Sequence, residues 1–452
     1  MESKIMKKTL LGVVALFIVA PGSLLKGQTN MNYKEYNQII KENIYKDYKK
    51  MYREAGDAFA FPFITPGSNS YADALWDWDS WLSDIALRQI LLDKGTEKDK
   101  KEARVYEQGC ILNFLSYCHS DGWMPITIDR KLGVRSSKPE NINEVNMHKP
   151  CLAQHAAFLV KEDNGNAEWL RDKFANLQYF IGGYKTRYYS KATGLYFWQN
   201  DVMIGVDNDP CTYYRPDRSS ASIFLNCLMY KELKAASYLA ERLDLMEIQK
   251  DYERDAQKLK EAIQEHCWDE RDGFFYSVDL NLKPIDPKAF FHSGAPRDWD
   301  CLIQRIDVWS GFLAMWADIA TPEQAKRMVL EHYNNTKTFN APYGVRTLSK
   351  LEKMYNVKAS SNPSSWLGPI WGISNYMTWR GLVKYGFKKE ARELATKTIV
   401  MFGRDFEKTG VLHEYYQPEN GAPILNPGFQ NWNYLVLNML NWMDGKHVVE
   451  EF

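Results

Sequence analysis

The feature that most constrains the fold of this chain is a regular alternation of helical pairs with longer loops. Apolar residues recur with a period near 3.6 in about a dozen stretches, which predicts helices. These stretches cover residues 32–54, 80–94, 98–119, 150–161, 166–189, 219–243, 246–267, 304–318, 322–334, 365–385, 388–405 and 429–443. Strand patterns are short, as at 195–198 and 274–277. The pattern therefore predicts an all-α fold with small β segments in its loops.

Paired helices can bury a shared core in two ways, by stacking as an open solenoid or by closing into a ring. A helical solenoid usually carries a sequence repeat of about 34–40 residues, and this chain has none. We therefore expect a closed toroid of six helical hairpins that forms one domain over residues 28–452. The ends of the inner helices and the long loops of such a ring surround one central pocket, where chemistry is expected.

The composition is that of a globular protein with an excess of aromatic side chains. Of the 452 residues 45% are hydrophobic and 25% charged, and 57 basic residues balance 57 acidic ones. Without net charge there is no broad field to hold a polyanion, so nucleic acid is not an expected partner. Aromatic residues make up 14% of the chain. Aromatic faces pack on pyranose rings while Tyr and Trp reach sugar hydroxyls, so a carbohydrate is the expected ligand.

The N-terminus has the three regions of a secretory signal peptide. Three lysines precede an apolar run from Thr9 to Ala20, and Pro21-Gly22 and a polar segment follow it. About a dozen apolar residues are too few to span a bilayer comfortably. We expect cleavage near Gly27 and export to the periplasm or the medium, with no membrane span in the mature chain. A buried core helix is the alternative.

Several familiar catalytic motifs are absent from the chain. There is no phosphate-binding G-x-x-x-x-G-K-[ST], no dinucleotide-binding G-x-G-x-x-G and no serine-hydrolase G-x-S-x-G. His413-Glu414 begins a zinc-protease pattern, but Gln417 stands where the second His is needed. The eight histidines form no compact cluster and the seven cysteines no framework of pairs. We therefore expect no dedicated zinc site, and we expect most cysteines to be small buried apolar side chains.

Carboxylates lie among aromatic residues in four loops, the first of which runs from Pro66 to Trp81. Between its indoles, Asp79 can accept hydrogen bonds from two hydroxyls of a pyranose, and the indoles exclude water from them. The same carboxylate could instead cap the N-terminus of the helix expected at 80–94. The spacing leaves both interpretations open.

The second loop contains Asp207-Asn208-Asp209-Pro210 and continues to Arg218. An acidic residue packed against Val, Pro and aromatic side chains can have a raised pKa, which a general acid needs in order to hold its proton near neutrality. Asp207 is the candidate for that role. Asn-Asp-Pro is also an ordinary turn sequence, so a purely structural turn is the alternative.

The third and fourth loops lie in the C-terminal third of the chain. In the third, Trp366 and Trp371 flank a Gly-Pro pair where a helix is expected to start. These indoles would either line the floor of a pocket or simply pack at the helix entry. The fourth loop contains Glu414, the second candidate carboxylate. Glu419, which precedes Asn-Gly, is expected to be an exposed turn residue.

The four loops together resemble glycoside hydrolase family sixty-three and its relatives, the trehalases and the mannosylglycerate and glucosylglycerate hydrolases. The matching motifs are Trp78-Asp79-Ser80 after Pro66-Gly67, Asp207-Asn208-Asp209-Pro210, Trp366 through Trp371, and Glu414-Tyr415 with Pro418 to Gly421 beyond it. The resemblance runs from about Phe61 to Met443. It implies an (α/α)6 toroid of the six-hairpin glycosidase type, which hydrolyses α-glycosides with inversion and without a cofactor.

The resemblance also implies roles for residues of this chain. Asp207 would protonate the glycosidic oxygen and Glu414 would activate water on the opposite face of the sugar, with the two carboxyl groups about 6.5–9.5 Å apart. The expected substrate is an α-linked glucoside or mannoside, either an oligosaccharide or similar to a glycosylglycerate. The residues expected to bind it are Tyr71, Trp76, Trp78, Asp79, Arg218, Arg346, Trp366, Gly368, Trp371, Tyr415 and Trp432.

The sequence leaves two other functions open. Helical toroids also include polysaccharide lyases and sugar epimerases, which use His or Tyr in place of two carboxylates. His148 or His155 in the pocket, with Glu414 outside it, would favour that function. An exported glycan-binding protein without turnover is the other alternative, and a pocket with only one carboxylate would support it.

Overall fold

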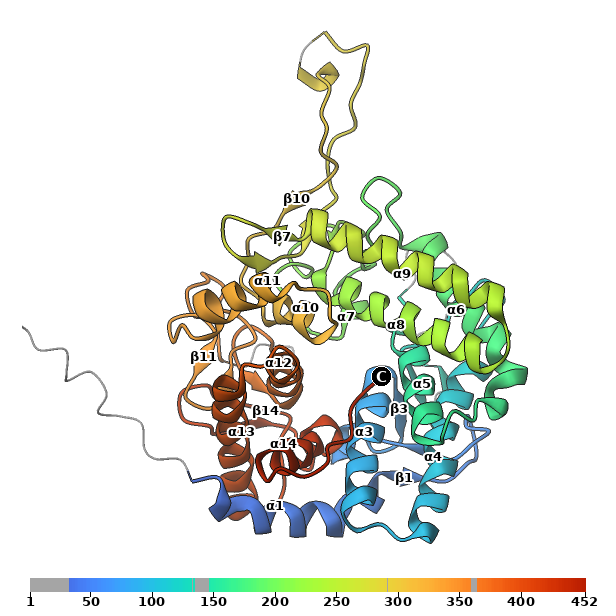
Figure 1. The fold of residues 1–452 in the computed structure, drawn as a ribbon, viewed down its shortest axis with the longest axis vertical. Coiled ribbons are helices and arrows are strands. Elements are labelled where there is room, and N and C mark those ends of the chain that lie inside the picture. Colours follow the sequence, from blue (N-terminus) through green and yellow to red (C-terminus); the bar gives the residue numbers. More distant parts are fainter. Residues whose placement is uncertain (1–31, 132, 135–145, 291, 359–363) are drawn as a thin grey trace, which may run out of the picture. The chain divides into compact units, whose positions relative to one another are not determined.

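Helices in two concentric layers make up most of the structure, a computed structural model (Figure 1). It describes residues 32–131, 133–134, 146–290, 292–358 and 364–452. The expected signal peptide at 1–27 lies outside these residues. Residues 32–452 form one compact unit. No helix in the part that the structure describes is both long and apolar enough to cross a membrane.

The inner layer consists of helices that contact one another in order around a common centre. Its elements are α3 (Asp77–Lys94), α5 (Leu152–Glu162), α8 (Ile223–Arg242), η5 (Trp309–Phe312) with α10 (Leu313–Trp316), α12 (Gly372–Lys384), and η7 (Asn431–Leu435) with α14 (Val436–Met443). Contacts run from α3 to α5, α8, α10 and α12 in turn. The η7–α14 segment touches both α12 and α3, which closes the ring.

The outer layer packs around these helices. Its elements are α1 (Lys34–Asp47), α4 (Glu97–Ser116), α6 (Phe174–Arg187), α9 (Met246–His266), α11 (Pro322–Arg327) with the π-helical η6 (Met328–Tyr333), and α13 (Lys388–Thr409). The short elements η1 (Tyr48–Met51), α2 (Ser68–Tyr71), η3 (Glu168–Lys173), α7 (Asp201–Ile204) and η4 (His292–Gly294) lie in the connections. Outer α4, α9 and α13 contact inner α3, α8 and α12, respectively. The predicted (α/α)6 toroid is confirmed.

The two layers differ in how much of each helix they bury. In inner α3 every residue from Asp77 to Leu91 is buried, because neighbours cover it on several sides. In outer α9 the buried residues are Ala256, Leu259, Ala262 and Ile263, which form one stripe at helical spacing. An inner helix must therefore satisfy its own buried polar groups. Within α3, Arg88 does so by pairing with a buried glutamate of α4 at 2.6 Å.

Short antiparallel strands join the loops at the rims of the ring. The sheets are β1 (Tyr52–Arg53) with β2 (Phe63–Ile64); β3 (Ala74–Trp76), β4 (Thr127–Asp129) and β5 (Gly133–Val134); β6 (Ser220–Ala221), β9 (Val278–Asp279) and β10 (Leu302–Ile303); β7 (Trp268–Asp269) with β8 (Phe274–Phe275); β11 (Asn340–Ala341) with β12 (Gly344–Val345); and β13 (Ile370–Trp371), β14 (Tyr415–Tyr416) and β15 (Pro423–Leu425). The β13–β14 pair is important for the site, because it places Trp371 opposite Tyr415.

Two predicted helix starts and one predicted strand are wrong. Helix α12 begins at Gly372 and not at 365, because Gly368 has a φ of +134° and the proline after it cannot donate a helical hydrogen bond. The helix predicted at 304–318 begins only at Trp309, since the chain before it leaves β10 in an extended form. The strand predicted at 195–198 is reduced to a single bridge between Tyr189 and Tyr196.

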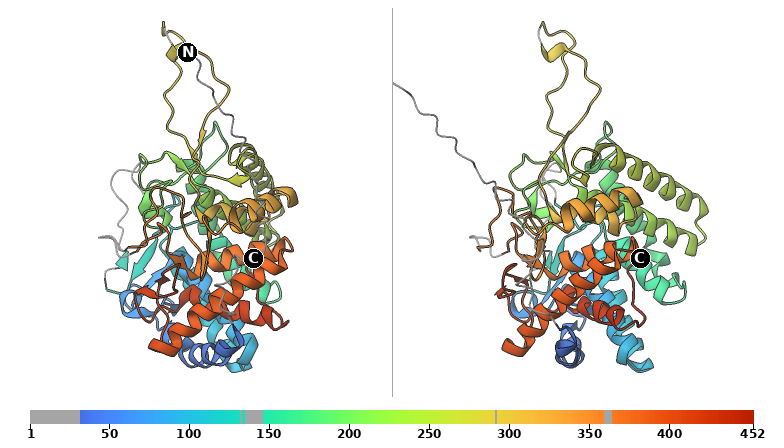
Figure 2. Two further views of the ribbon diagram at one scale, coloured as in Figure 1. Left: turned by 90° about the vertical axis from the view of Figure 1, so that its left-hand side faces the viewer. Right: turned by 60° about the vertical axis from the view of Figure 1, so that its left-hand side comes forward.

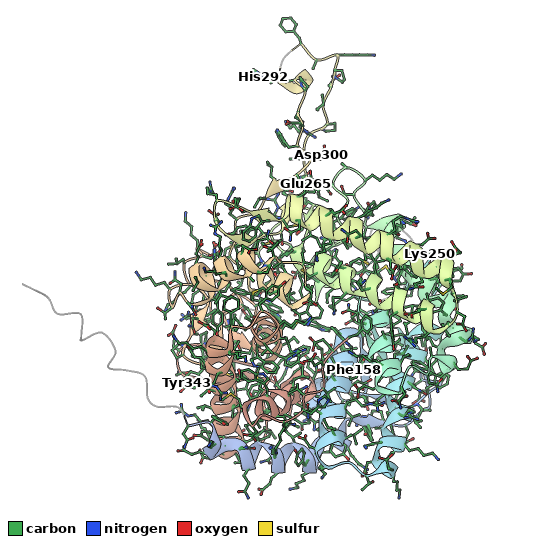
Figure 3. The ribbon with its side chains drawn as sticks, viewed as in Figure 1. Phe158, Lys250, Glu265, His292, Asp300 and Tyr343 are labelled. Atoms are coloured by element: carbon green, nitrogen blue, oxygen red, sulfur yellow. The ribbon has the colours of Figure 1, made fainter. Side chains whose placement is uncertain are left out.

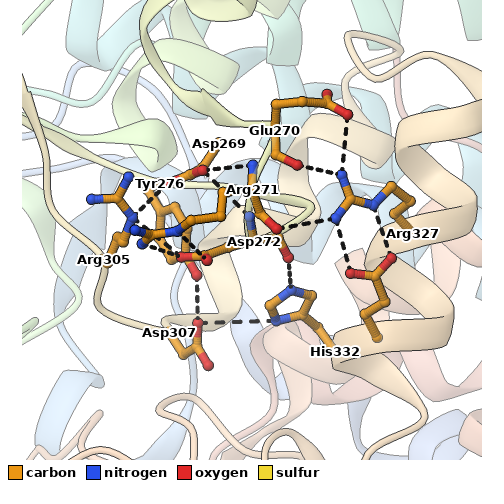
Figure 4. A network of polar contacts seen from close by, with 10 residues as sticks. Asp269, Glu270, Arg271, Asp272, Tyr276, Arg305, Asp307, Arg327 and His332 are labelled. Carbon is orange, nitrogen blue, oxygen red and sulfur yellow. Dashed lines mark hydrogen bonds and ion pairs between the residues drawn. The ribbon is translucent and has the colours of Figure 1, made fainter.

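A long arm projects from the ring between β9 and β10 (Figures 1 and 2). Figure 3 shows His292 and Asp300 on this arm, away from the packed side chains of the ring. A polar network fixes the chain at its base (Figure 4). Directly after β10, Arg305 pairs with Asp269 at 2.5 Å and with Asp272 at 3.2 Å. These ion pairs tie the arm to the β7–β8 turn.

Candidate active site

The starts of several inner helices meet at one end of the ring, where the predicted loops lie. Trp78, in the first turn of α3, has its ring 5.8 Å from Phe224 of α8 and 5.0 Å from Trp432 of η7. Phe224 lies 6.0 Å from Trp309, the first residue of η5. Four segments far apart in the sequence thus form a single aromatic cluster at this end.

Glu414, directly before β14, is held by two neighbouring side chains. Its Oε1 accepts a hydrogen bond from the Tyr71 hydroxyl at 2.9 Å, and its Oε2 accepts one from the Asn426 amide. Only 4% of the residue is exposed. Burial raises the pKa of Glu414 to about 7, the two hydrogen bonds oppose that rise, and the negative charge of Asp207 adds to it. Glu414 can therefore exchange a proton near neutral pH.

Asp207 lies on the turn after α7, within electrostatic range of Glu414. Its charge also contributes to the raised pKa of Tyr71, after the larger effects of burial and of Glu414 itself. The Asp207 carboxylate is half-buried and has no hydrogen-bond partner among the described residues. The structure thus brings the two candidate carboxylates together, one of them held by donors and the other free to contact a ligand.

The residues after Asp207 have structural roles. Asn208 Oδ1 accepts a hydrogen bond from the Trp366 backbone amide at 3.0 Å, which joins this turn to the third loop. Asp209 Oδ2 accepts one from the Thr212 hydroxyl at 3.1 Å, and burial raises the pKa of Asp209 to about 7. Asn-Asp-Pro is therefore a turn, as the alternative interpretation held, and this turn also positions Asp207.

Asp79 lies in the first turn of α3, whose N-cap residue is Trp76. The interpretation of Asp79 as the N-cap is therefore wrong. Its Oδ1 accepts a hydrogen bond from the Asn431 amide at 2.5 Å, and Ser83 donates to the Asn431 oxygen at 3.1 Å. Burial raises the pKa of Asp79 to about 8, and the charge of Asp77 adds to this effect. Asp79 belongs to the same electrostatic group, because Glu414 also raises its pKa.

A buried ion pair packs against the ring of Trp78. Lys149 Nζ lies 2.9 Å from Asp77 Oδ1 and 5.2 Å from the centre of the Trp78 ring. Burial raises the pKa of Asp77, but the charge of Lys149, the influence of His148 and the hydrogen bonds that Lys149 donates together outweigh it and hold that pKa below its usual value. A Cβ on Gly205, two residues before Asp207, would lie 2.6 Å from Lys149 Cε. Lys149 therefore packs against both Trp78 and the turn that carries Asp207.

Stacked rings form the floor of the cluster. The Trp366 and Trp371 rings lie 4.0 Å apart and almost parallel, and Tyr415 stacks on Trp371 at 4.8 Å. Trp371 donates its indole N–H to a backbone oxygen of the same loop. The indole N–H groups of Trp366, Trp432 and Trp76 are buried without a partner among the described residues. An indole N–H of this kind can donate a hydrogen bond to a sugar hydroxyl.

Gly368 shapes the loop between the two stacked indoles. Its φ of +134° is open only to glycine, and a Cβ there would lie 2.4 Å from the Tyr355 ring. Its backbone amide donates to the Thr347 hydroxyl at 3.1 Å. The contacts of Gly368 are thus to the protein itself, and they fix how Trp366 enters the cluster.

Neither predicted arginine contacts the side chains around Glu414. Arg218 donates to the Gln199 side chain at 3.2 Å and to the Arg187 carbonyl at 2.8 Å. Arg346 is buried, donates to two backbone oxygens and pairs with Glu419 at 2.9 Å. Glu419 is half-exposed, as expected of a turn residue. Both arginines order loops in this structure, and their roles as substrate ligands remain predictions.

The two histidines of the alternative function are engaged elsewhere. His148 packs edge-on against Phe114 and Phe180, and burial lowers its pKa to about 4. His155 is bonded to Asp84 within the inner layer, and burial lowers its pKa to about 3. Within the described residues no group of three His, Cys, Asp or Glu side chains could hold a metal ion.

Three side chains of the site were not predicted from the sequence. Asn426 and Asn431 bind Glu414 and Asp79, and both have a positive φ, 50° and 37°. A positive φ at Asn is common in loops and left no distinct pattern in the sequence. Lys149 stands before a proline, in a position that gave no sign of its long-range partner Asp77.

Residues 72–433 match the family model of the mannosylglycerate hydrolase MGH1-like glycoside hydrolase domain. The chain belongs to this family. It is a glycoside hydrolase family, as the four motifs predict. A lyase, an epimerase and a non-catalytic glycan-binding protein are correspondingly not supported.

Solved structures of other glycosidases share the fold of this family member. The family sixty-three mannosylglycerate hydrolase from Thermus thermophilus, in complex with glucose, is 18% identical with a TM-score of 0.62. The match covers 90% of this chain and 98% of that one. Neutral trehalase from Saccharomyces cerevisiae is 18% identical with a TM-score of 0.58, over 85% and 74% of the two chains.

Curated relatives of this glycoside hydrolase match over part of their length. A cytosolic neutral trehalase from Kluyveromyces lactis is 26% identical over 213 residues, 45% of this chain and 25% of that protein. A probable mannosyl-oligosaccharide glucosidase from Schizosaccharomyces pombe is 21% identical over 303 residues, 65% and 34% of the two. The matched region thus spans about a quarter to a third of these two relatives.

Proposed function

We propose that this glycoside hydrolase is an exported enzyme that cleaves an α-linked glucoside or mannoside with inversion of configuration. Asp207 is the general acid and Glu414 the general base. The observation that carries the proposal is that two carboxyl groups, more than 200 positions apart in the sequence, share one aromatic site without a metal cluster among the described residues. Hydrolysis by a general acid and a general base requires such a pair of carboxyl groups.

The two carboxyl groups differ in ways that suit different roles. The Tyr71 hydroxyl and the Asn426 amide both donate to Glu414, so they stabilise and orient its anion, the form that takes a proton from water. Asp207 receives no such bond among the described residues, so its carboxyl group is available to a glycosidic oxygen. Asp207 can therefore give its proton to that oxygen while Glu414 accepts one from the attacking water.

The aromatic side chains and Asp79 complete the proposed sugar site. The unpartnered indole N–H groups of Trp76, Trp366 and Trp432 can donate to hydroxyls, and the Asp79 carboxyl group, whose pKa burial raises to about 8, can exchange hydrogen bonds with them. Burial of these groups excludes bulk water, which strengthens each hydrogen bond to the substrate. Relatives named as trehalase, mannosylglycerate hydrolase and mannosyl-oligosaccharide glucosidase support an α-glucosyl or α-mannosyl substrate. A panel of α-linked disaccharides and glycosylglycerates, assayed for released monosaccharide, tests this choice.

Inversion leads to a direct prediction about the product. Hydrolysis of an α-linked substrate should release the β-anomer first, because water attacks the face opposite the departing oxygen. Proton NMR during the first minutes, before mutarotation, measures the anomer. Early α-anomer would contradict inversion and would indicate a nucleophilic carboxylate about 5–5.5 Å from the acid.

Export leads to a second prediction. The lysine-flanked apolar run before Gly27 should be removed during secretion, because it has the regions that a signal peptidase system recognises. N-terminal sequencing of protein recovered outside the cytoplasm should therefore begin near Gln28. Protein found only in the cytoplasm, with Met1 or Glu2 at its start, would rule export out.

A further inference from the structure

A cavity lies at the C-terminal ends of α5 and α10 and along α8, away from Glu414. Its volume is about 500 Å³, and its walls come from α5, α8, the residues after α10, and Phe452. Because α5, α8 and α10 begin near the aromatic cluster and end here, the cavity is separate from the proposed sugar site. Figure 1 shows the C-terminus at the centre of the ring, close to the inner helices.

Lys231 of α8 lines this cavity in an unusual environment. Only 9% of the residue is exposed, although lysine is rarely buried without a partner. Its ammonium has no hydrogen-bond acceptor and no ion-pair partner among the described residues. It lies 5.7 Å from the centres of the Trp316 and Phe452 rings. The Lys231 side chain is thus almost wholly buried, while its ammonium lies against two ring faces and faces the cavity.

The other buried lysines of the described chain each have an oxygen partner, which Lys231 lacks. Lys149 pairs with an aspartate at 2.9 Å. Lys397 pairs with Glu393 at 2.7 Å and donates to the Asn340 side chain at 2.5 Å. Each of these ammonium groups thus has an oxygen partner from the protein, whereas Lys231 has none within the described chain. Within the described chain, an oxygen partner for Lys231 could come only from a molecule that enters the cavity.

The acidic groups nearest Lys231 are already engaged. Glu451 accepts hydrogen bonds from Trp316 at 2.9 Å and from Arg380 at 3.1 Å. Asp318, at the rim of the cavity, pairs with Lys384 at 2.7 Å. Neither carboxylate is paired with Lys231, so the cavity keeps a positive charge at its wall.

The remaining lining residues suit an organic anion. Lys161 and Lys234 are exposed at the rim and carry two further positive charges. Tyr230 and Tyr238 offer ring faces and hydroxyl groups, and the Phe452 ring lies 5.2 Å from that of Tyr238. We propose that this cavity binds a small organic anion, whose phosphate or carboxylate group pairs with Lys231 while its body lies against these rings.

The ionisation of Lys231 agrees with this site. Burial lowers the pKa of Lys231 to about 8; the positive charges of Lys384 and Arg380 add to the effect, whereas Glu451 and Asp318 oppose it. A bound anion would raise that pKa, so binding near pH 8 takes up a proton and weakens as the pH rises. In the free protein the low pKa disfavours folding below pH 8, and this penalty disappears as the pH rises toward the ordinary lysine value of 10.5.

Thermal unfolding and calorimetry of the full chain test the site. Inorganic phosphate and glucose 6-phosphate are the probes, with potassium chloride at equal ionic strength as the reference. Both probes should raise the midpoint of unfolding saturably. Lys231→Met should lower phosphate affinity at least tenfold, yet raise the midpoint in chloride by a few degrees, because it removes an unpaired buried charge. The matched control Lys397→Met should lower the midpoint in chloride and keep the response to phosphate.

Lys234→Met provides a second test of phosphate binding if Lys231→Met folds poorly. This exposed position should weaken phosphate binding about two- to fivefold without affecting stability. Tighter binding of glucose 6-phosphate than of phosphate would show that the organic body contributes, and equal binding would assign the site to the anionic group alone. Absence of saturable binding, or unchanged affinity in both variants, overturns the proposal. Glycosidase activity should be unaffected by Lys231→Met, so the outcome is independent of the proposed function.

Discussion

Asp207→Asn should lose most of its activity on natural α-glycosides, by about 10²–10⁴-fold, while it keeps much more of its activity on an α-glycosyl fluoride. An amide cannot protonate the glycosidic oxygen, so a sugar or glycerate leaving group departs slowly. Fluoride departs as an anion without a proton, so the same variant should hydrolyse it far better. The ratio of kcat/KM on the two substrates, compared with wild type, measures the effect.

Asp209→Asn is the matched control for this experiment. Asp209 is two positions away, buried, and hydrogen-bonded to the Thr212 hydroxyl. Its substitution should therefore lower the activity on both substrates by a similar factor, and by less than Asp207→Asn lowers the activity on natural α-glycosides. If Asp209→Asn abolished turnover while Asp207→Asn stayed near wild type, the general acid would be Asp209. If neither substitution altered turnover, the acid would lie outside this loop.

The ring of helices could be predicted from the sequence because the patterns that indicate it can be recognised without knowing any contact between distant residues. Helical periodicity and the absence of a repeat are visible in short windows, and they were enough to predict paired helices that close on themselves. The wrong helix start at 365 has a cause that is not local. The positive φ of Gly368 exists because the Tyr355 ring fills the space where a Cβ would lie, and that contact is made across the fold.

The grouping of the three carboxyl groups could be expected from the sequence for a different reason. Glu414, Asp207 and Asp79 each stand in a segment rich in aromatic residues, and that pattern is visible in the sequence even though the three segments are far apart. Their partners leave no such pattern. Asn426 and Asn431 are single asparagines, and they belong to the site only because the fold places them beside Glu414 and Asp79, to which they donate hydrogen bonds.

The arginines show the limit of choosing residues by type. Arg346 follows a Pro-Tyr-Gly-Val segment near the third loop and has the charge to bind a substrate. In the folded chain its guanidinium is buried and donates to two carbonyl groups and Glu419. A buried guanidinium needs such partners for stability, and the sequence does not indicate whether protein or substrate supplies them.

The aromatic cluster combines observed packing with a proposed role in ligand binding, and the sequence could not separate the two. Trp371 is stacked on both sides and donates its N–H to the backbone, so it mainly fixes the floor. Trp366 and Trp432 share the packing but leave their N–H groups unpartnered among the described residues. An indole ring that packs against its neighbours can therefore still use its N–H group to bind a ligand.

Glu414→Gln should lose activity on the natural substrate and on the glycosyl fluoride alike, by about 10²–10⁴-fold, because both reactions need a base to activate water. The change keeps the shape of the side chain and an oxygen for the Tyr71 hydroxyl, so circular dichroism and thermal unfolding should show an intact fold. If Glu414→Gln were as active as the wild type on either substrate, Glu414 would not be the general base.

The pH profile of the wild type and of Tyr71→Phe distinguishes a base from a merely structural carboxylate. With its pKa raised to about 7, Glu414 is protonated at lower pH, so kcat/KM should fall tenfold per pH unit below about pH 7. The Tyr71 hydroxyl lowers that pKa by donating to the anion, so Tyr71→Phe should move the acid limb to higher pH. A structural role for Tyr71 would reduce activity at every pH and leave the limb in place. An unmoved limb in this variant would therefore count against Glu414 as the titrating base.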